Sequence, residues 1–310
     1  MNKKGDFFSA LFVLILLVAI GYGGYYLYQN FPRDTIQLIT QDKIEIRVNN
    51  TLPSKQFYEN MRYADKIISY HISSSCPESK SSKMIEAIKT LESKTILVFR
   101  ESSNAEINIL CSDVSPQAEE KNHFVAGEGG PSRVLNTTLY SVILEGKVAL
   151  YREGNCNNAN VATHELLHAL GFDHNNNPKS ILYPTLKCDQ EIDSEIINSI
   201  NELYSVSSLP DLLFDKINAT KSGRYLNFHF EVLNRGLKEA KSVNVNLYAD
   251  DELMESFDLK EISIGSKKII DVQNLKVPLN SKTIEFVIDY ENQISEIYEN
   301  NNRVILNAIN

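Results

Sequence analysis

The sequence predicts an α+β domain followed by an all-β Ig-like sandwich, with a transmembrane helix before both. Three observations indicate this order. Residues 1–30 contain a long apolar segment, residues 34–206 mix helical and strand patterns, and residues 209–310 contain evenly spaced β-rich runs. A chain of 310 residues accommodates two domains of about 100–150 residues behind a short N-terminal segment.

The N-terminal segment is apolar enough to cross a membrane. No charged residue occurs from Phe7 to Pro32, and a spanning helix needs about 20 apolar residues. Lys3 and Lys4 precede it, so we expect a single-pass protein with a cytoplasmic N-terminus and both domains outside. A cleaved signal peptide fits the same segment and would give a secreted protein. The tyrosines near its end favour an anchor, because they resemble an interfacial belt: Tyr22, Tyr25, Tyr26 and Tyr28.

The composition is that of a folded protein without a nucleic-acid partner. Hydrophobic residues make up 43% of the chain and charged residues 23%. The formal net charge is −9, and no cluster of Lys and Arg is present that would bind phosphates.

All four cysteines follow the apolar segment, in the part of the chain that we expect to be exported. They include no CxxC pair, and an oxidising compartment favours two disulfides. Three pairings are possible. We favour Cys76 with Cys111 and Cys156 with Cys188, and four reduced thiols are the alternative in a reducing compartment.

The first domain begins with strand patterns and ends in helices near Ser208. We expect a strand at Ile44–Val48, a helix or irregular segment from Ser54 to Tyr70, and a helix within Cys76–Leu91. Short strands are predicted next at Thr95–Phe99 and Glu106–Leu110, and the glycines of His123–Ser132 lie where a strand ends or bulges. Ser141–Tyr151 is predicted to form two strands or a hairpin around Glu145–Lys147.

Two further helices complete the first domain, and strands alone make up the second. One helix contains HELLH, and the other lies within Gln190–Tyr204, where apolar residues form one face. The predicted strands of the second domain are Tyr225–Leu233, Ser242–Tyr248, Ser266–Val272, Thr283–Ile288 and Arg303–Ala308.

The stretch HELLHALGFDH contains three candidate metal ligands, His164, His168 and His174. His164 and His168 are four residues apart, so on a helix both rings face the same side and reach one ion. A continuing helix would point His174 away, but Gly171 allows a left-handed residue at which the chain turns back. Three imidazoles and an open position describe one catalytic Zn²⁺, with Glu165 placed to act as the general base.

These residues resemble the HExxHxxGxxH signature of the metzincin metallopeptidases, and the region from about 34 to 206 is most similar to the matrixin branch. The turn that follows normally contains methionine, whereas SILYP has Leu182 at that position. Leucine conserves the volume, so we expect a formed site. Tyr183 is one residue too early to match the metal-reaching tyrosine of some relatives, and no cysteine precedes the domain to act as a latency switch.

The C-terminal region resembles the CARDB domains of prokaryotic surface proteins. The similarity rests on PDLLF, FEVLNRG and IDYENQISEIYENNN. It implies a protein or glycan ligand at the cell surface. Asp289, Glu296 and Glu299 raise the possibility of calcium, although we favour a solvated loop.

Two functions fit these observations. The first is an exported, membrane-anchored zinc endopeptidase that acts on protein or peptide substrates. The alternative is a catalytically weak or inactive adhesion protein that uses the first domain as a scaffold. The intact Glu165 favours the enzyme, and Leu182 is the one feature that favours the scaffold.

Overall fold

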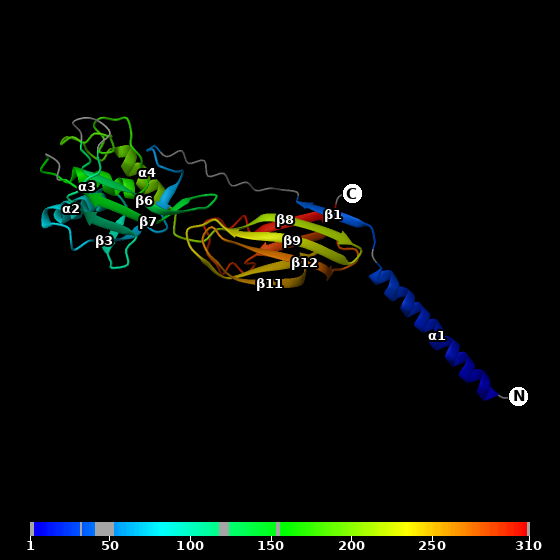
Figure 1. The fold of residues 1–310 in the computed structure, drawn as a ribbon. Coiled ribbons are helices and arrows are strands. Elements are labelled where there is room, and N and C mark those ends of the chain that lie inside the picture. The colour runs from blue at the N-terminus through cyan, green and yellow to red at the C-terminus, as the bar shows by residue number, and fades with distance from the viewer. Residues whose placement is uncertain (1–2, 32, 41–52, 118–123, 153–155, 309–310) are drawn as a thin grey trace.

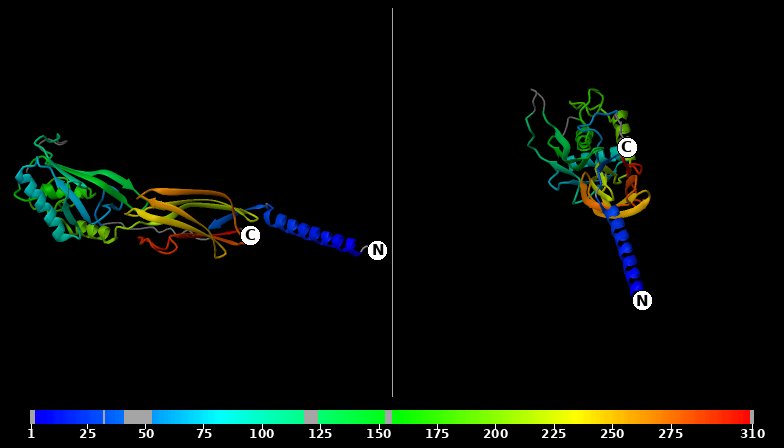
Figure 2. Two further views of the ribbon diagram at one scale, coloured as in Figure 1. Left: turned by 90° about the horizontal axis from the view of Figure 1, so that it is seen from below. Right: turned by 90° about the vertical axis from the view of Figure 1, so that its right-hand side faces the viewer.

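The computed structural model describes residues 3–31, 33–40, 53–117, 124–152 and 156–308. Its three parts follow one another along a line: the N-terminal helix α1 (Lys3–Asn30), a β domain and an α+β domain at the far end (Figures 1 and 2). Within α1, Phe8–Asn30 has a mean hydropathy of 2.1 and is not buried by the rest of the protein. This helix is long and apolar enough to cross a membrane, and a signal sequence would meet the same criteria.

A six-stranded mixed sheet forms the centre of the α+β domain. Its order is β2-β7-β5-β3-β4, all parallel, with β6 added antiparallel along β7. Among the strands that the structure describes, β6 pairs only with β7, so it forms an edge of the sheet. The strands are β2 (Met61–Tyr63), β3 (Ile67–Ile72), β4 (Val98–Glu101), β5 (Ile107–Cys111), β6 (Gly127–Asn136) and β7 (Ser141–Leu150).

Strand β7 is one continuous strand of 10 residues, so the interpretation of a hairpin or two strands around Glu145–Lys147 was wrong. Gly146 is a packing glycine and not a turn residue. A Cβ atom there would lie 2.3 Å from the hydroxyl of Tyr63, which donates to the carbonyl of Ala169 at 3.1 Å. Tyr63 thereby satisfies a carbonyl at the end of the helix that carries HELLH.

Three helices pack on this sheet: α2 (Glu78–Lys94), α3 (Asn160–Ala169) and α4 (Ser194–Ser205). The buried residues of α2 recur at helical spacing, from Met84 through Ile88 to Leu91. Helix α4 is capped by the preceding residue, Asp193, whose side chain accepts a hydrogen bond of 3.0 Å from the Ile196 amide. Residues from these helices and the sheet share one hydrophobic core.

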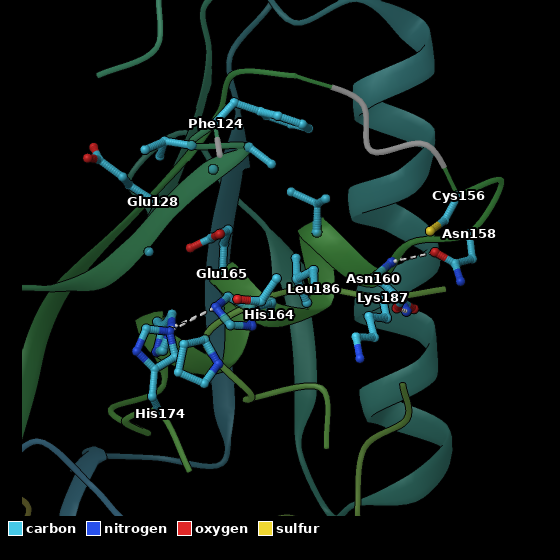
Figure 3. A pocket seen from close by; sticks show the side chains of 18 of the residues that line it. Phe124, Glu128, Cys156, Asn158, Asn160, His164, Glu165, His174, Leu186 and Lys187 are labelled. Carbon is cyan, nitrogen blue, oxygen red and sulfur yellow. Dashed lines mark hydrogen bonds between the residues drawn. The ribbon is translucent and has the colours of Figure 1, made fainter. Parts of the chain in front are cut away.

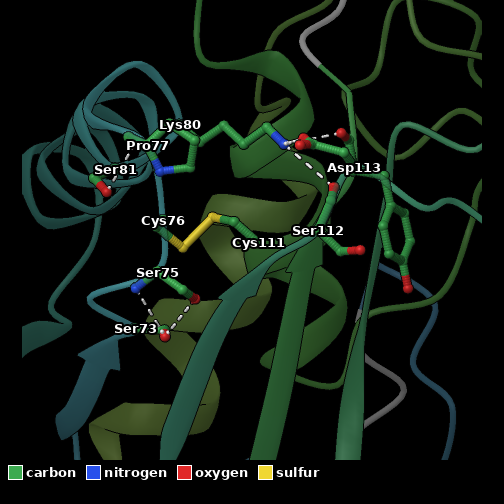
Figure 4. The surroundings of a disulfide bond; sticks show 10 residues. Ser73, Ser75, Cys76, Pro77, Lys80, Ser81, Cys111, Ser112 and Asp113 are labelled. Atoms are coloured by element: carbon green, nitrogen blue, oxygen red, sulfur yellow. Dashed lines mark hydrogen bonds and ion pairs between the residues drawn. A yellow bond between two sulfur atoms is a disulfide. The ribbon is translucent and has the colours of Figure 1, made fainter.

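The disulfides Cys76–Cys111 and Cys156–Cys188 are both formed, which confirms the favoured pairing. The first joins the start of α2 to the end of β5 (Figure 4).

The β domain is a single eight-stranded antiparallel sheet that curls around its own apolar core, in the order β11-β10-β13-β14-β1-β8-β9-β12. Its edge strands β11 and β12 also contact each other. The strands are β1 (Thr35–Thr40), β8 (Leu212–Ser222), β9 (Tyr225–Asn234), β10 (Ala240–Ala249), β11 (Glu252–Ile262), β12 (Lys267–Lys276), β13 (Thr283–Ile288) and β14 (Arg303–Ala308).

Strand β1 corrects the predicted start of the first domain at residue 34. Thr35–Thr40 pairs with β14 on one side and β8 on the other, so it belongs to the β domain. Leu38 is buried in the core of that domain, whereas Ile39 on the opposite face is 48% exposed. The predicted strand at Ile44–Val48 lies outside the described residues.

A small apolar cluster joins the two domains. Leu139, Tyr140 and Val142 from the α+β domain pack with Leu237 from the β domain. Beside them, the Thr137 hydroxyl donates to the carbonyl of Arg235 at 3.0 Å. On the α+β side of this cluster, the guanidinium of Arg62 donates to the carbonyls of Leu203 and Val206 at the end of α4.

The acidic residues near the C-terminus support the fold. Asp289 and Glu296 are buried, so the prediction of a solvated loop was wrong for these two. Asp289 accepts from the Ile294 amide at 2.6 Å, and Glu296 accepts from the Leu212 amide and from Asn302. Burial raises the pKa of Glu296 to about 8.

The position of β1 predicts different effects for two neighbouring substitutions. Leu38→Ala should lower the stability of the β domain by about 2–5 kcal/mol, because it removes a buried leucine. Ile39→Ala is the control and should cost less than about 1 kcal/mol, since that side chain is half exposed. Denaturant unfolding monitored on the β domain measures both, and equal effects would contradict the pairing of β1.

Candidate metal centre

The metal-site helix and the turn after it bring the three histidines together. His164 and His168 lie on one face of α3, and both are buried. The helix ends at Ala169, and Gly171 then has a φ of +95°, which confirms the predicted left-handed residue. A Cβ atom at Gly171 would also lie 2.6 Å from the Met61 side chain. The chain therefore reverses here and returns His174 to the other two rings.

The three Nε2 atoms converge on one point. They are 3.0 Å apart for His164 and His168, and 3.2 Å apart for each of the two pairs with His174. The Nδ1 atoms of His164 and His168 lie 2.6 and 2.7 Å from the carbonyls of Ile181 and Phe172. A carbonyl only accepts, so each Nδ1 carries the proton and each Nε2 of this pair presents a lone pair.

This donor set fits a cation. Two unprotonated nitrogen atoms cannot hydrogen-bond to each other, so a separation of 3.0 Å suits a cation that both of them bind. Ligands that lie about 2.0–2.1 Å from a tetrahedral Zn²⁺ are separated by about 3.3 Å, close to the distances found here. Within the described part of the chain, these histidines are the group of His, Cys, Asp and Glu side chains that could hold a metal.

Burial keeps the histidines neutral. Desolvation and the neighbouring His168 lower the pKa of His164 to about 3, and desolvation also lowers the pKa of His168 and His174. Neutral imidazole is the form that binds metal, so these rings are ready as ligands without first losing protons.

Glu165 follows His164 directly and is buried beside β6. Its carboxylate faces the cleft, in view of the histidines (Figure 3). Desolvation, with a smaller contribution from Glu128, raises the pKa of Glu165 to about 8 in the metal-free protein. A cation at the histidines favours the charged form, because an opposite charge stabilises a carboxylate.

Two glycines on β6 make room for Glu165. A Cβ atom at Gly129 would lie 2.0 Å from the Glu165 carbonyl oxygen, and one at Gly127 would lie 2.7 Å from Cγ of Glu165. The sequence interpretation assigned these glycines to a strand end or bulge. The alternation Gly127-Glu128-Gly129 could have indicated this role, because it places both glycines on one face of a strand, where a neighbouring element can approach closely.

The SILYP turn supports the cluster through its backbone. Ile181 supplies the carbonyl next to His164, and the carbonyl of Leu182 accepts from the Asn175 amide at 3.0 Å. Leu182 is fully buried in the domain core, while Tyr183 is half-buried and does not line the cleft. Ser180 is fully buried, and its hydroxyl accepts from Asn175 and from the Leu182 amide. The motif did not reveal this role of Ser180.

The cluster opens into a cleft of about 840 Å³. One side is formed by β6 from Gly127 to Gly129, and the other by residues 184–188. Phe57 lies beside His168, with ring centroids 5.7 Å apart, and also lines the cleft. The cleft therefore offers an extended groove that passes the three nitrogen atoms and Glu165.

Adjacent glycines on β6 give a matched test of this packing. Gly129→Ala should lower the melting temperature and displace Glu165, because the new methyl group meets the backbone of α3. Gly130→Ala should be nearly neutral, since nothing lies within 4 Å of the position of its Cβ atom. Thermal unfolding of both variants measures the difference, and a neutral Gly129→Ala would show that the strand and helix are farther apart.

The lowered histidine pKa values predict a pH dependence in metal-free protein. In the unfolded chain these histidines take up protons below about pH 6.5, whereas folded His164 stays neutral down to about pH 3. The unfolded state binds more protons in this window, so the free energy of unfolding should fall as the pH is lowered.

The measurement uses Glu165→Gln protein in the presence of a chelator, because the raised pKa of Glu165 acts in the opposite sense between about pH 4.5 and 8. Urea unfolding at pH 7.5 and 5.5, followed by a probe in the α+β domain so that Glu296 of the β domain does not contribute, should give a lower stability at pH 5.5. Equal stabilities would mean that the rings are solvated when no metal is bound.

Comparison with known proteins confirms both resemblances. A family model described as matrixin matches residues 62–205, and one described as CARDB matches residues 209–305. Macrophage metalloelastase from Rattus norvegicus is 48% identical over 48 residues, which is 14% of this chain and 10% of that protein. The chain thus spans about a tenth of this curated relative.

Two solved structures are similar to part of this chain. A CARDB domain from Pyrococcus furiosus is 20% identical and covers 32% of this chain and 94% of that chain, with a TM-score of 0.28. A domain of a putative cell surface protein from Methanosarcina acetivorans is 19% identical and covers 33% and 93%, with a TM-score of 0.27. The family matches assign the two parts: the chain carries a matrixin domain at residues 62–205 followed by a CARDB domain at residues 209–305.

Proposed function

We propose that this protein is an exported, membrane-anchored zinc endopeptidase. The observation that carries the proposal is the convergence of the Nε2 atoms of His164, His168 and His174 beside Glu165 in an open cleft. The matrixin match supports a metallopeptidase, and the apolar helix α1 supports export.

The chain's own residues have separate roles in this reaction. When bound, Zn²⁺ supplies a Lewis acid and lowers the pKa of water towards about 7. Glu165 takes the proton from the attacking water and passes it to the leaving amine of the peptide. Ile181 and Phe172 hold the rings of His164 and His168 through their carbonyls, so these ligands need no rearrangement.

The substrate of this proposal is a protein or peptide in an extended conformation. The cleft runs between the edge strand β6 and residues 184–188, with the histidines on its floor. The CARDB domain holds this cleft away from α1 and is the part that would bind a surface protein or glycan (Figure 1).

The alternative is an inactive scaffold, and Leu182 was the feature that favoured it. Leu182 is fully buried, and its carbonyl accepts a hydrogen bond from the backbone amide of Asn175, the residue after His174. A leucine that fills its place in the core gives no reason for a collapsed site. The enzyme is therefore the function that the geometry supports best.

Glu165→Gln is the decisive substitution. It keeps the three imidazoles but removes the group that accepts the proton. Cleavage should fall by about 10²- to 10⁴-fold with the zinc content unchanged, because this is the usual contribution of a general base. Zinc analysis and a protein-cleavage assay on the same preparation make the measurement.

The companion variant Leu182→Met tests the scaffold. It should change turnover and stability only slightly, because the two side chains have similar volumes. If wild type cleaves no protein but Leu182→Met does, the leucine has disabled the enzyme and the scaffold is the better explanation. A loss of zinc in Glu165→Gln would instead assign a structural role to the glutamate.

A further inference from the structure

One side of the cleft is a segment without helix or strand, Pro184–Cys188, which we call the wall segment. All five of its residues line the cleft. Because no ladder of backbone hydrogen bonds fixes such a segment, its position depends on side chains from elsewhere. The width of the cleft depends on that position.

A disulfide and two asparagines attach the wall segment to the start of α3. Cys188 is bonded to Cys156, and the amide of Asn158 donates to the Cys188 carbonyl at 3.0 Å. The amide of Asn160, the first residue of α3, donates to the carbonyls of Lys187 at 2.9 Å and Gln190 at 3.3 Å. Figure 3 shows Cys156, Asn158, Asn160 and Lys187 together along this side of the cleft.

Gln190 holds the same segment from behind. It is buried, its side-chain oxygen accepts from the Lys187 amide at 2.8 Å, and its nitrogen donates to the carbonyls of Thr185 and Pro178. Pro178 belongs to the loop that follows His174. The wall segment is thus hydrogen-bonded, directly or through Gln190, both to the helix that carries His164 and to the loop after His174.

The second disulfide serves as an internal comparison. Cys76–Cys111 has a sequence separation of 35, against 32 for Cys156–Cys188. Loops of nearly equal length restrict the unfolded chain to nearly the same extent. Neither Cys76 nor Cys111 lines the cleft, whereas both Cys156 and Cys188 do. The two bonds therefore differ in place and not in their effect on chain entropy.

We propose that the Cys156–Cys188 disulfide and Asn160 fix the wall segment and thereby restrict which substrate side chains the cleft accepts. Asn160 is a positioning residue in this scheme, because it acts through the backbone of Lys187 and Gln190. Val161 of α3 and Leu186 of the wall segment both line the cleft, so the position of the wall sets the space that a substrate side chain finds beside these two apolar residues. This proposal rests on the proposed peptidase function.

The first experiment compares two double variants of the full chain in detergent. Cys156→Ser with Cys188→Ser should broaden the cleavage profile on a peptide library and raise KM about tenfold, with the zinc content unchanged. Cys76→Ser with Cys111→Ser should lower the melting temperature similarly but keep the wild-type profile. The same change of profile in both pairs would assign the effect to lost stability and overturn the proposal.

The second experiment does not depend on cleavage. Asn160→Asp keeps the shape of the side chain but replaces a donor by a carboxylate that faces two carbonyl oxygens. Hydrogen exchange of residues 184–190 should accelerate about five- to tenfold in this variant and in Asn160→Ala. The control Asn157→Ala changes a neighbouring exposed asparagine and should leave exchange unaltered.

The two arms separate the failure of this proposal from the failure of the proposed function. Unchanged exchange in both Asn160 variants would show that the wall segment is held without Asn160 and would sink the proposal. If the Asn160 variants accelerate exchange but the wild-type protein cleaves no peptide, the claim about substrate selectivity is overturned together with the proposed peptidase function. If the double variant Cys156→Ser with Cys188→Ser does not fold, the cleavage profile of Asn160→Asp on the peptide library tests the proposal instead. A wild-type profile in Asn160→Asp would then refute it.

Discussion

The candidate metal site depends on one reversal of the chain, at Gly171. Helix α3 places His164 and His168 in register, but a third ligand six residues later reaches the same point only if the helix stops and the chain turns back. A φ of +95° makes that turn, and Met61 leaves no space for a side chain. The turn also brings the carbonyl of Phe172 to Nδ1 of His168. One backbone conformation therefore places His174 and fixes the tautomer of His168.

Glu165 is held by a second constraint, the close approach of β6 to α3. Glycines at 127 and 129 let the strand backbone touch the glutamate, while Glu128 between them points to the opposite face and accepts from the Tyr151 hydroxyl at 2.7 Å. Removing side chains on one face of an edge strand weakens the strand, since glycine has a high entropic cost. In return the Glu165 carboxylate is largely removed from water beside the three histidines, where a bound cation would strongly lower its pKa.

The local parts of this structure could be predicted from the sequence, and the long-range parts could not. The convergence of His164, His168 and His174 and the left-handed Gly171 follow from helical geometry within eleven residues, and the two disulfides are the pairing that was favoured among three. The strand at Thr35–Thr40 was not predicted, and no local pattern shows which sheet accepts it, because it pairs with strands about 180 and 270 residues away. Gly146 was misinterpreted for the same reason, because only the position of Tyr63 shows that the glycine provides space and not a turn.

The path of the chain explains how the two domains are held together. The chain leaves α1, contributes β1 to the CARDB sheet, passes through the whole matrixin domain and returns to the same sheet at β8, the direct neighbour of β1. The matrixin domain is thus attached through both of its ends to one sheet, and the cluster around Leu139 and Leu237 holds the contact between the domains. Two attachments and a packed interface oppose rotation about a single linker. The CARDB sheet lies between the matrixin domain and α1 (Figure 2).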